Sequence, residues 1–357
     1  MEVKTDLSEN LKSYLANRFL SASEKRVIED LFWVENNNAF HRKPIEFLKL
    51  CFPQLCFPIE KGVGESKLYR DATLKGKFNN FEGEKNFLKL NDKDSIQLFL
   101  YKSFAGNVPV IVISDESDFV KIAQALLYRN SPKEIPMSMG ACLINGINNW
   151  QKINLLKKEW QNKSPANDTW SYEFKEHIFP YPSLYKDKLI LLSKKKYSGV
   201  ESNAVGLAEN EWLEISFKIR LEHECTHLFT LSQFGIASNN LHDELIADYI
   251  GITKALGNFN KEWMLLFLGL EQFPNYRKGA RLENYIENFN FEDFSKLKNI
   301  IKNAVENICL FDLEIGKHNS RDEELIRRIK TLCKVSLLDI SSKKGNLILI
   351  DEYSRIY

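Results

Sequence analysis

The chain has 357 residues, of which 44% are hydrophobic and 27% are charged, as in an ordinary globular protein. Lys and Arg number 49 and Asp and Glu number 48, which gives a net charge of +1. This charge is too small to attract the chain to nucleic acid or to an anionic membrane. These figures exclude a disordered chain, a collagen-like repeat and a coiled coil. The longest apolar runs, 108–113 and 263–270, fall far short of the roughly 20 residues of a membrane-spanning helix.

The N-terminus and the cysteines both favour a cytoplasmic protein. Residues 1–6 lack the cationic and apolar segments of a secretory signal. Six cysteines are scattered along the chain without a Cys-x-x-Cys pair, which argues against a disulfide framework or a zinc knuckle. We therefore expect reduced thiols, most of them buried, and neither a nucleic acid nor a membrane as partner.

The first half of the chain predicts helices followed by a mixed region. Apolar residues at helical spacing predict two helices within 6–35, separated near 21–23, whereas 36–83 has the composition of loops. A helix is expected over 118–128. Three apolar runs predict strands: 108–114, 139–147 and 189–193. Strands that alternate with helices indicate an α/β arrangement.

The second half is predicted to be helical. Six stretches have helical periodicity: 211–234, 242–256, 261–271, 279–288, 291–309 and 322–334. Gly235 and Gly257 are placed to end two of these helices. The apolar run 346–351 predicts a last strand.

These elements predict an α+β fold in four parts. The parts are a helical and loop-rich region (1–85), a mixed α/β subdomain (86–210), a helical lobe (211–340) and a C-terminal tail or strand (341–357). The residues with the clearest functional pattern lie in the helical lobe.

Residues 223–227 read His-Glu-Cys-Thr-His, the pattern H-E-x-x-H, within a predicted helix. Residues four apart on a helix differ by about 40° in direction and about 6 Å in height, so both imidazoles can meet at one metal ion. Glu224 lies beside that face and can reach a water at the ion without binding the ion itself. Cys225 points away from the histidines and is expected in the core.

A second motif follows on the next predicted helix. Glu244 lies seventeen residues after His227, and Asp248 lies four residues after Glu244. The pair 239–240, Asn-Asn, predicts a turn that folds this helix back on the first. Glu244 can then be a third ligand, and Asp248 can accept the Nδ1–H of a ligating histidine. His242 is an alternative third ligand. A further alternative is that the acidic residues at the start of this helix only stabilise the helix through its dipole and bind no metal.

Together, H-E-C-T-H at 223–227 and E-L-I-A-D at 244–248 resemble the gluzincin class of zinc metallopeptidases, which includes the thermolysin-like enzymes. The resemblance implies a zincin-like fold with one Zn²⁺ per chain on two adjacent helices. Its implied site residues are the ligands His223, His227 and Glu244, the general base Glu224 and the supporting Asp248.

Three positions bear on this assignment. Asp243 stands where thermolysin-like members usually have Asn. A metzincin would need Gly and His where the chain has Thr230 and Gln233. Imidazole and carboxylate ligands in a tetrahedral site favour zinc over other divalent metals.

The implied reaction is hydrolysis of a peptide bond. Zinc lowers the pKa of a bound water to about 7 and polarises the carbonyl group, while Glu224 moves the proton from water to the leaving nitrogen. Candidates for the hydrogen-bond donor to the oxyanion are Tyr276, Tyr285 and His318.

Other segments are candidates for substrate contacts. The class pairs the substrate backbone with an edge strand before the active helix, and 203–207 is the candidate strand, with Tyr197 and Ser198 as weaker candidates. The run 276–281 mixes aromatic and cationic residues; it either binds a substrate carboxylate or, as we favour, caps a helix.

The leading hypothesis is therefore a cytoplasmic zinc peptidase acting on a peptide or protein. Two alternatives stay open. One is a catalytically inactive, zinc-stabilised interaction protein, and the other is a regulatory protease specific for one cellular protein.

Overall fold

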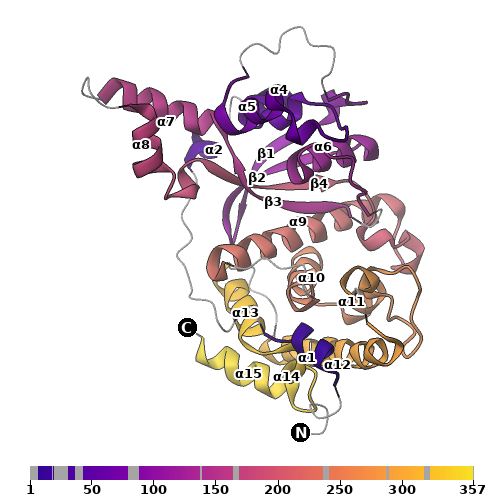
Figure 1. Cartoon of the computed structure of the whole chain (residues 1–357). Coiled ribbons are helices and arrows are strands. Elements are labelled where there is room, and N and C mark those ends of the chain that lie inside the picture. The colour runs from indigo at the N-terminus through magenta and orange to yellow at the C-terminus, as the bar shows by residue number, and fades with distance from the viewer. Residues whose placement is uncertain are drawn as a thin grey trace. The chain divides into compact units, whose positions relative to one another are not determined.

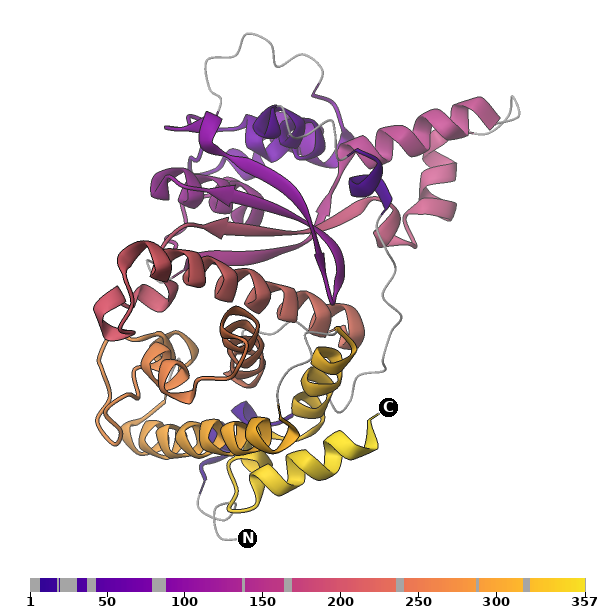
Figure 2. The ribbon, with the colours of Figure 1, turned by 180° about the vertical axis from the view of Figure 1, so that it is seen from behind.

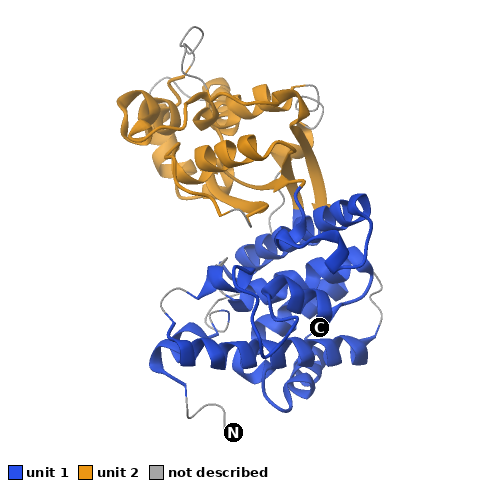
Figure 3. Ribbon diagram, turned by 90° about the vertical axis from the view of Figure 1, so that its right-hand side faces the viewer, with its two compact units in different colours: residues 1–27, 103–106, 195–357 blue, residues 28–102, 107–194 orange. Residues whose placement is uncertain are grey.

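The computed structural model describes residues 7–17, 19, 31–36, 43–78, 88–136, 139–163, 169–235, 241–286, 289–316 and 322–356. The chain divides into two compact units (Figure 3). Unit 1 comprises residues 1–27, 103–106 and 195–357, and unit 2 comprises 28–102 and 107–194. These units differ from the four ranges expected from the sequence, because the chain enters each unit more than once. The architecture is mixed α+β, as predicted.

Unit 2 is built on a four-stranded sheet of order β1-β2-β4-β3. The strands are β1 (Gln97–Ser103), β2 (Gly106–Ile113), β3 (Ala141–Asn148) and β4 (Lys186–Ser193). Strand β4 runs parallel to β2, with Ile111 opposite Leu191, and antiparallel to β3. The three predicted strands are confirmed. The edge strand β1 was not predicted, because its partly exposed residues lack a clear apolar alternation.

Helices cover one face of this sheet (Figure 1). Ile111 of β2 and Leu189 and Leu191 of β4 share a buried core with residues of α4 and α6. The helices and single turns of the unit are α2 (Leu31–Glu35), α4 (Pro44–Cys51), η2 (Pro53–Cys56), η3 (Val63–Glu65), α5 (Lys67–Lys75), η4 (Lys93–Ser95), α6 (Glu116–Tyr128), α7 (Trp150–Lys163), α8 (Trp170–Glu173), η5 (Phe174–Ile178) and η6 (Pro182–Leu184).

The expectation of loops over 36–83 is wrong where α4 and α5 lie. Both helices are short, and local capping residues define them. Pro44 begins α4, while the Ser66 hydroxyl accepts the Tyr69 N–H at the start of α5 and Gly76 ends it with φ +65°. The predicted break at 21–23 lies outside the described residues.

Unit 1 is helical. Its elements are α1 (Glu9–Tyr14), η7 (Tyr197–Gly199), η8 (Ser202–Ala204), α9 (Glu209–Phe234), α10 (Leu241–Leu256), α11 (Lys261–Leu268), η9 (Arg281–Tyr285), α12 (Phe291–Ile315), α13 (Asp322–Lys334), α14 (Leu337–Ile340) and α15 (Gly345–Arg355). The predicted helices are confirmed over the described residues, except that 279–286 contains the short 3₁₀ helix η9 in place of the helix expected over 279–288. Gly235 ends α9 in the left-handed conformation, and Gly257 follows α10 with φ +80°.

Two predicted strands of unit 1 are wrong. Residues 346–351 belong to helix α15, in which Leu349 is buried while Leu347 is 56% exposed, because an apolar run this short fits either structure. Residues 203–207, expected to pair with substrate, begin in the 3₁₀ turn η8, and Gly206 then takes φ +73°, which extended backbone does not adopt.

Helix α10 is enclosed on all sides. Every residue from Leu241 to Thr253 is buried, and α9, α11, α12 and α13 surround the helix (Figures 1 and 2). Gly251 permits the close approach of α9, since a Cβ atom there would lie 2.7 Å from the carbonyl oxygen of Ile219 and 3.5 Å from the Cβ of His223. The acidic residues of α10 are therefore held directly against the histidines of α9.

None of the described helices is long and apolar enough to cross a membrane.

Candidate metal centre

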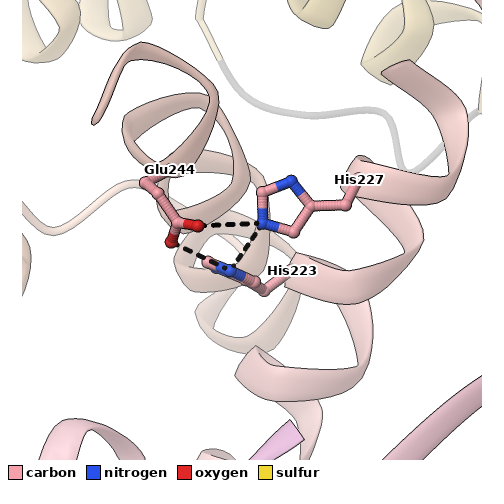
Figure 4. A group of neighbouring side chains, drawn as sticks. All are labelled: His223, His227 and Glu244. Atoms are coloured by element: carbon pink, nitrogen blue, oxygen red, sulfur yellow. Dashed lines mark hydrogen bonds and ion pairs between the residues drawn. The ribbon is translucent and has the colours of Figure 1, made fainter. Parts of the chain in front are cut away.

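Three side chains from two helices converge at one point. His223 and His227 project from one face of α9, and Glu244 of α10 points toward both (Figure 4). The two Nε2 atoms lie 3.0 Å apart, and Glu244 places Oε2 3.4 Å from His223 Nε2 and Oε1 3.5 Å from His227 Nε2. The side chains are 8%, 11% and 7% exposed, respectively. These residues form a group that could hold a metal ion.

Each histidine turns its other ring nitrogen to an aspartate of α10. His223 Nδ1 lies 2.9 Å from Asp248 Oδ1, and His227 Nδ1 lies 2.9 Å from Asp243 Oδ2. A carboxylate only accepts hydrogen bonds, so both Nδ1 atoms carry a ring proton, and each Nε2 atom can present a lone pair to a cation or bind a second proton. Two nitrogen lone pairs and a carboxylate cannot bond one another, so a proton or a cation has to lie among them.

When no cation is bound, a proton takes this place, as the pKa shifts of His227 and Glu244 indicate. Burial lowers the pKa of His227, but the negative charges of Asp243 and Glu244 outweigh burial and raise it well above its usual value. Burial raises the pKa of Glu244, but hydrogen bonds from His223 and His227 outweigh burial and lower it well below its usual value. Glu244 is thus held as the carboxylate that a metal ligand must be.

Glu224 is the neighbour of His223 and is 7% exposed. Burial raises the pKa of its carboxyl group, although the charges of His223 and His227 act in the opposite direction. Within the described part of the chain, this carboxylate forms neither a hydrogen bond nor an ion pair. A carboxylate with free oxygens and a raised pKa is suited to take up a proton from a bound molecule.

A layer of polar residues lies behind Asp248. The Tyr197 hydroxyl donates to Asp248 Oδ1 at 2.6 Å, and Arg281 forms an ion pair with Asp248 Oδ2. Arg281 also donates from Nη1 to the Tyr197 hydroxyl at 2.8 Å. Arg281 begins η9, as the helix-cap interpretation of 276–281 expects, but its guanidinium contacts Asp248 and Tyr197, which that interpretation did not foresee.

Of the remaining residues considered from the sequence, some lie beside the three-residue group and others do not. The Tyr285 hydroxyl donates to Glu244 Oε2 at 2.8 Å and so lies at the centre, whereas the Tyr276 hydroxyl donates to the Ala280 carbonyl at 3.0 Å. His242 lies 2.9 Å from the Leu332 carbonyl through Nε2 and is not part of the three-ligand group. Cys225 is fully buried, as expected. His318 and 239–240 lie outside the described residues.

Sequence reasoning missed the roles of Asp243, Tyr197 and Arg281. The position of Asp243, directly before Glu244 in the first turn of α10, was a usable signal, because it lies on the side of the helix that faces α9. Tyr197 and Arg281 are distant in sequence from both motifs, and only the tertiary fold brings them to Asp248.

Fold and site together define a mixed α+β protein with a His-His-Glu group able to hold a metal ion. A family model matches residues 2–344, and the chain belongs to that family, described as a family of unknown function (DUF7005). Searches of curated proteins and of solved structures returned no match.

Proposed function

We propose that this chain is a zinc-dependent peptidase of the gluzincin type, with a zincin-like site on α9 and α10. The observation that carries the proposal is the convergence of two imidazole lone pairs and one carboxylate, with each imidazole fixed from behind by an aspartate. Such aspartate–histidine pairs are the usual support of metal-binding histidines.

The donor set fits zinc better than the other common divalent ions. Ligands about 2.0–2.1 Å from a tetrahedral zinc ion lie about 3.3 Å from one another. The corresponding distances here are 3.0, 3.4 and 3.5 Å. Calcium and magnesium prefer six or more oxygen ligands, whereas imidazole suits zinc.

The residues around the ligands supply the parts of a hydrolytic reaction. A zinc ion contributes Lewis acidity, since it lowers the pKa of coordinated water to about 7 and polarises a carbonyl oxygen. Glu224 accepts a proton from water as the water oxygen bonds to the peptide carbonyl carbon. It then donates that proton to the amine nitrogen as the C–N bond breaks. Tyr285 is the proposed donor to the developing oxyanion, because its hydroxyl lies 2.8 Å from Glu244 Oε2, an oxygen of a proposed ligand.

The test combines metal content with cleavage of a fluorogenic peptide library. Wild type should bind one zinc per chain and lose both zinc and cleavage on treatment with a chelator. Glu224→Gln should keep the zinc and lose cleavage by about 10²- to 10⁴-fold, the usual contribution of a general base. Glu214→Gln, an exposed position on the same helix, serves as the control and should cleave normally. If the wild-type protein binds no zinc, the proposed function is wrong.

A zinc-loaded protein that cleaves nothing in the library would direct attention to the two alternatives. Comparing protein N-termini in cells that express wild type or Glu224→Gln separates them. New termini present only with wild type identify a protease specific for one cellular protein. Identical termini identify a zinc-stabilised interaction protein.

A further inference from the structure

The buried hydroxyl of Tyr197 contacts three residues at or behind the proposed zinc site. Its side chain is 3% exposed, and its hydroxyl lies 3.0 Å from His223 Nδ1, 2.6 Å from Asp248 Oδ1 and 2.8 Å from Arg281 Nη1. One phenol oxygen therefore contacts a proposed zinc ligand, the aspartate that supports this ligand, and the arginine that balances the aspartate.

The hydrogen-bonding capacity of these groups leaves one arrangement. A tyrosine hydroxyl has a single proton, and arginine can only donate. Arg281 donates to the Tyr197 oxygen, so the Tyr197 proton goes to Asp248. His223 Nδ1 then faces two oxygens that have no proton for it, and it must be the donor. Its Nε2 atom is left bare toward Glu244 and His227.

Tyr197 is held firmly in this place. The Ser216 hydroxyl of α9 accepts its backbone N–H at 3.0 Å, and Arg220 donates to the carbonyl oxygens of Lys195 and Lys196. Its ring packs edge-on against Phe267, with centroids 4.9 Å apart. The segment before α9 is thus fixed to α9 itself, the helix that carries both histidines.

A second network in the same unit has the same chemistry around a different aspartate. The Tyr249 hydroxyl donates to Asp312 Oδ1 at 2.6 Å and accepts from Arg328 Nη1 at 2.8 Å, and Arg328 pairs with Asp312 at 2.7 Å. Both tyrosines are buried, at 3% and 0% exposure. The Tyr249 hydroxyl bonds to an aspartate and an arginine as the Tyr197 hydroxyl does, so Tyr249 is a matched control for Tyr197.

We infer that Tyr197 is a positioning residue of the metal centre: its hydroxyl, together with Arg281, fixes Asp248 so that His223 presents Nε2 to the cation. This inference rests on the proposed zinc site. It adds a third layer, behind the ligand and its aspartate, that determines which nitrogen of His223 binds the metal. A residue in such a layer contributes to metal affinity and to ligand geometry without touching the ion.

The experiment compares full-length wild type, Tyr197→Phe and Tyr249→Phe. Zinc affinity is measured by competition with a chromophoric chelator, ligand geometry by the absorption spectrum of the Co²⁺-loaded protein, and stability by urea unfolding. Tyr197→Phe should bind zinc about tenfold more weakly and shift the Co²⁺ absorption bands. Tyr249→Phe loses an equivalent hydrogen bond, so it should lose similar stability while its zinc affinity and Co²⁺ spectrum stay those of wild type.

The outcomes separate this inference from the function on which it rests. Wild type without zinc affinity removes the proposed function. Wild type that binds zinc, with Tyr197→Phe either unchanged or no different from Tyr249→Phe, overturns the role of Tyr197 alone. If Tyr197→Phe does not fold, ¹⁵N-histidine NMR of zinc-loaded wild type decides. A protonated Nδ1 and metal-bound Nε2 at His223 support the inference, and metal on Nδ1 overturns it.

Discussion

His227 Nδ1 lies 2.9 Å from Asp243 Oδ2, and this aspartate is supported differently from the one behind the other histidine. Asp248 shares its charge with Arg281 and a hydrogen bond with Tyr197, whereas among the described residues Asp243 Oδ1 has no hydrogen-bond partner. The full negative charge of Asp243 is therefore directed at His227. The two proposed ligands differ in how strongly they are made to donate electrons to a cation.

Asp243→Asn tests this difference. The amide oxygen can still accept the Nδ1–H of His227, so the ring keeps its orientation, but the negative charge is gone. We expect zinc affinity to fall about 10- to 100-fold, and urea stability without zinc to fall as well, because the negative charge that raises the pKa of His227 is lost. Chelator competition and urea unfolding of the same preparations measure both. A stable variant with wild-type affinity would contradict the role given to Asp243.

Gly251→Ala tests the close approach of α9 and α10. The added methyl group would lie 2.7 Å from the Ile219 carbonyl oxygen, so the helices must separate beside His223. We expect a loss of about 1–3 kcal/mol in unfolding free energy, together with weaker zinc binding. Gly257→Ala is the control, since its Cβ meets nothing within 4 Å but its φ of +80° is unfavourable for alanine. It should lose stability and keep its zinc affinity.

Arg328→Met tests the second buried network. The Arg328 side chain is 0% exposed and pairs with Asp312 at 2.7 Å and with Glu324 at 2.6 Å. Removing one partner of a buried ion pair typically costs about 3–5 kcal/mol, because the other charges stay buried. Replacing Lys302, which is 30% exposed and pairs with Glu306 on α12, by Met should cost at most about 0.5 kcal/mol. Urea unfolding measures the loss of unfolding free energy for both variants. Equal losses would contradict the prediction that the buried ion pair contributes more than the partly exposed one.

Thiol reactivity tests the burial of the cysteines. Burial raises the pKa of Cys56 to about 11 and raises that of Cys225 well above its usual value. At pH 8 a thiol of pKa about 11 is ionised in about one molecule in 1,000, against about one in four for an ordinary cysteine. Alkylation of Cys56, followed by mass spectrometry, should therefore be about 250-fold slower in the native protein than in urea, and should accelerate as the pH rises toward 11. Equal rates in both states would contradict the burial.

The convergence of His223, His227 and Glu244 was predictable because its geometry is local. The spacing of His223 and His227 places both on one helix face whatever the rest of the chain does, and Glu244 and Asp248 are spaced likewise. Tyr197 lies 26 residues before His223, and Arg281 lies 33 residues after Asp248. No periodic pattern connects such positions, so their meeting at Asp248 depends on how η7 and η9 pack against α9 and α10.

The errors in the fold have equally physical causes. The apolar run at 346–351 is too short for its periodicity to separate a strand from a helix, and only packing in unit 1 decides in favour of α15. Helices α4 and α5 have 8 and 9 residues, so each contributes few apolar positions to a sequence pattern. Long helices such as α9, with 26 residues, were located within a few residues of their ends.

Asp248 and Tyr249 are neighbours on α10 but belong to separate networks, because consecutive helical residues point about 100° apart. The helix is therefore clamped along two directions, toward Arg281 and toward Arg328, by bonds that do not involve the ligand atoms themselves. A movement of α10 that displaces Asp248 would break its hydrogen bond with Tyr197 and its ion pair with Arg281. Capture of an ion then requires no refolding, and its rate should follow the arrival and dehydration of the ion.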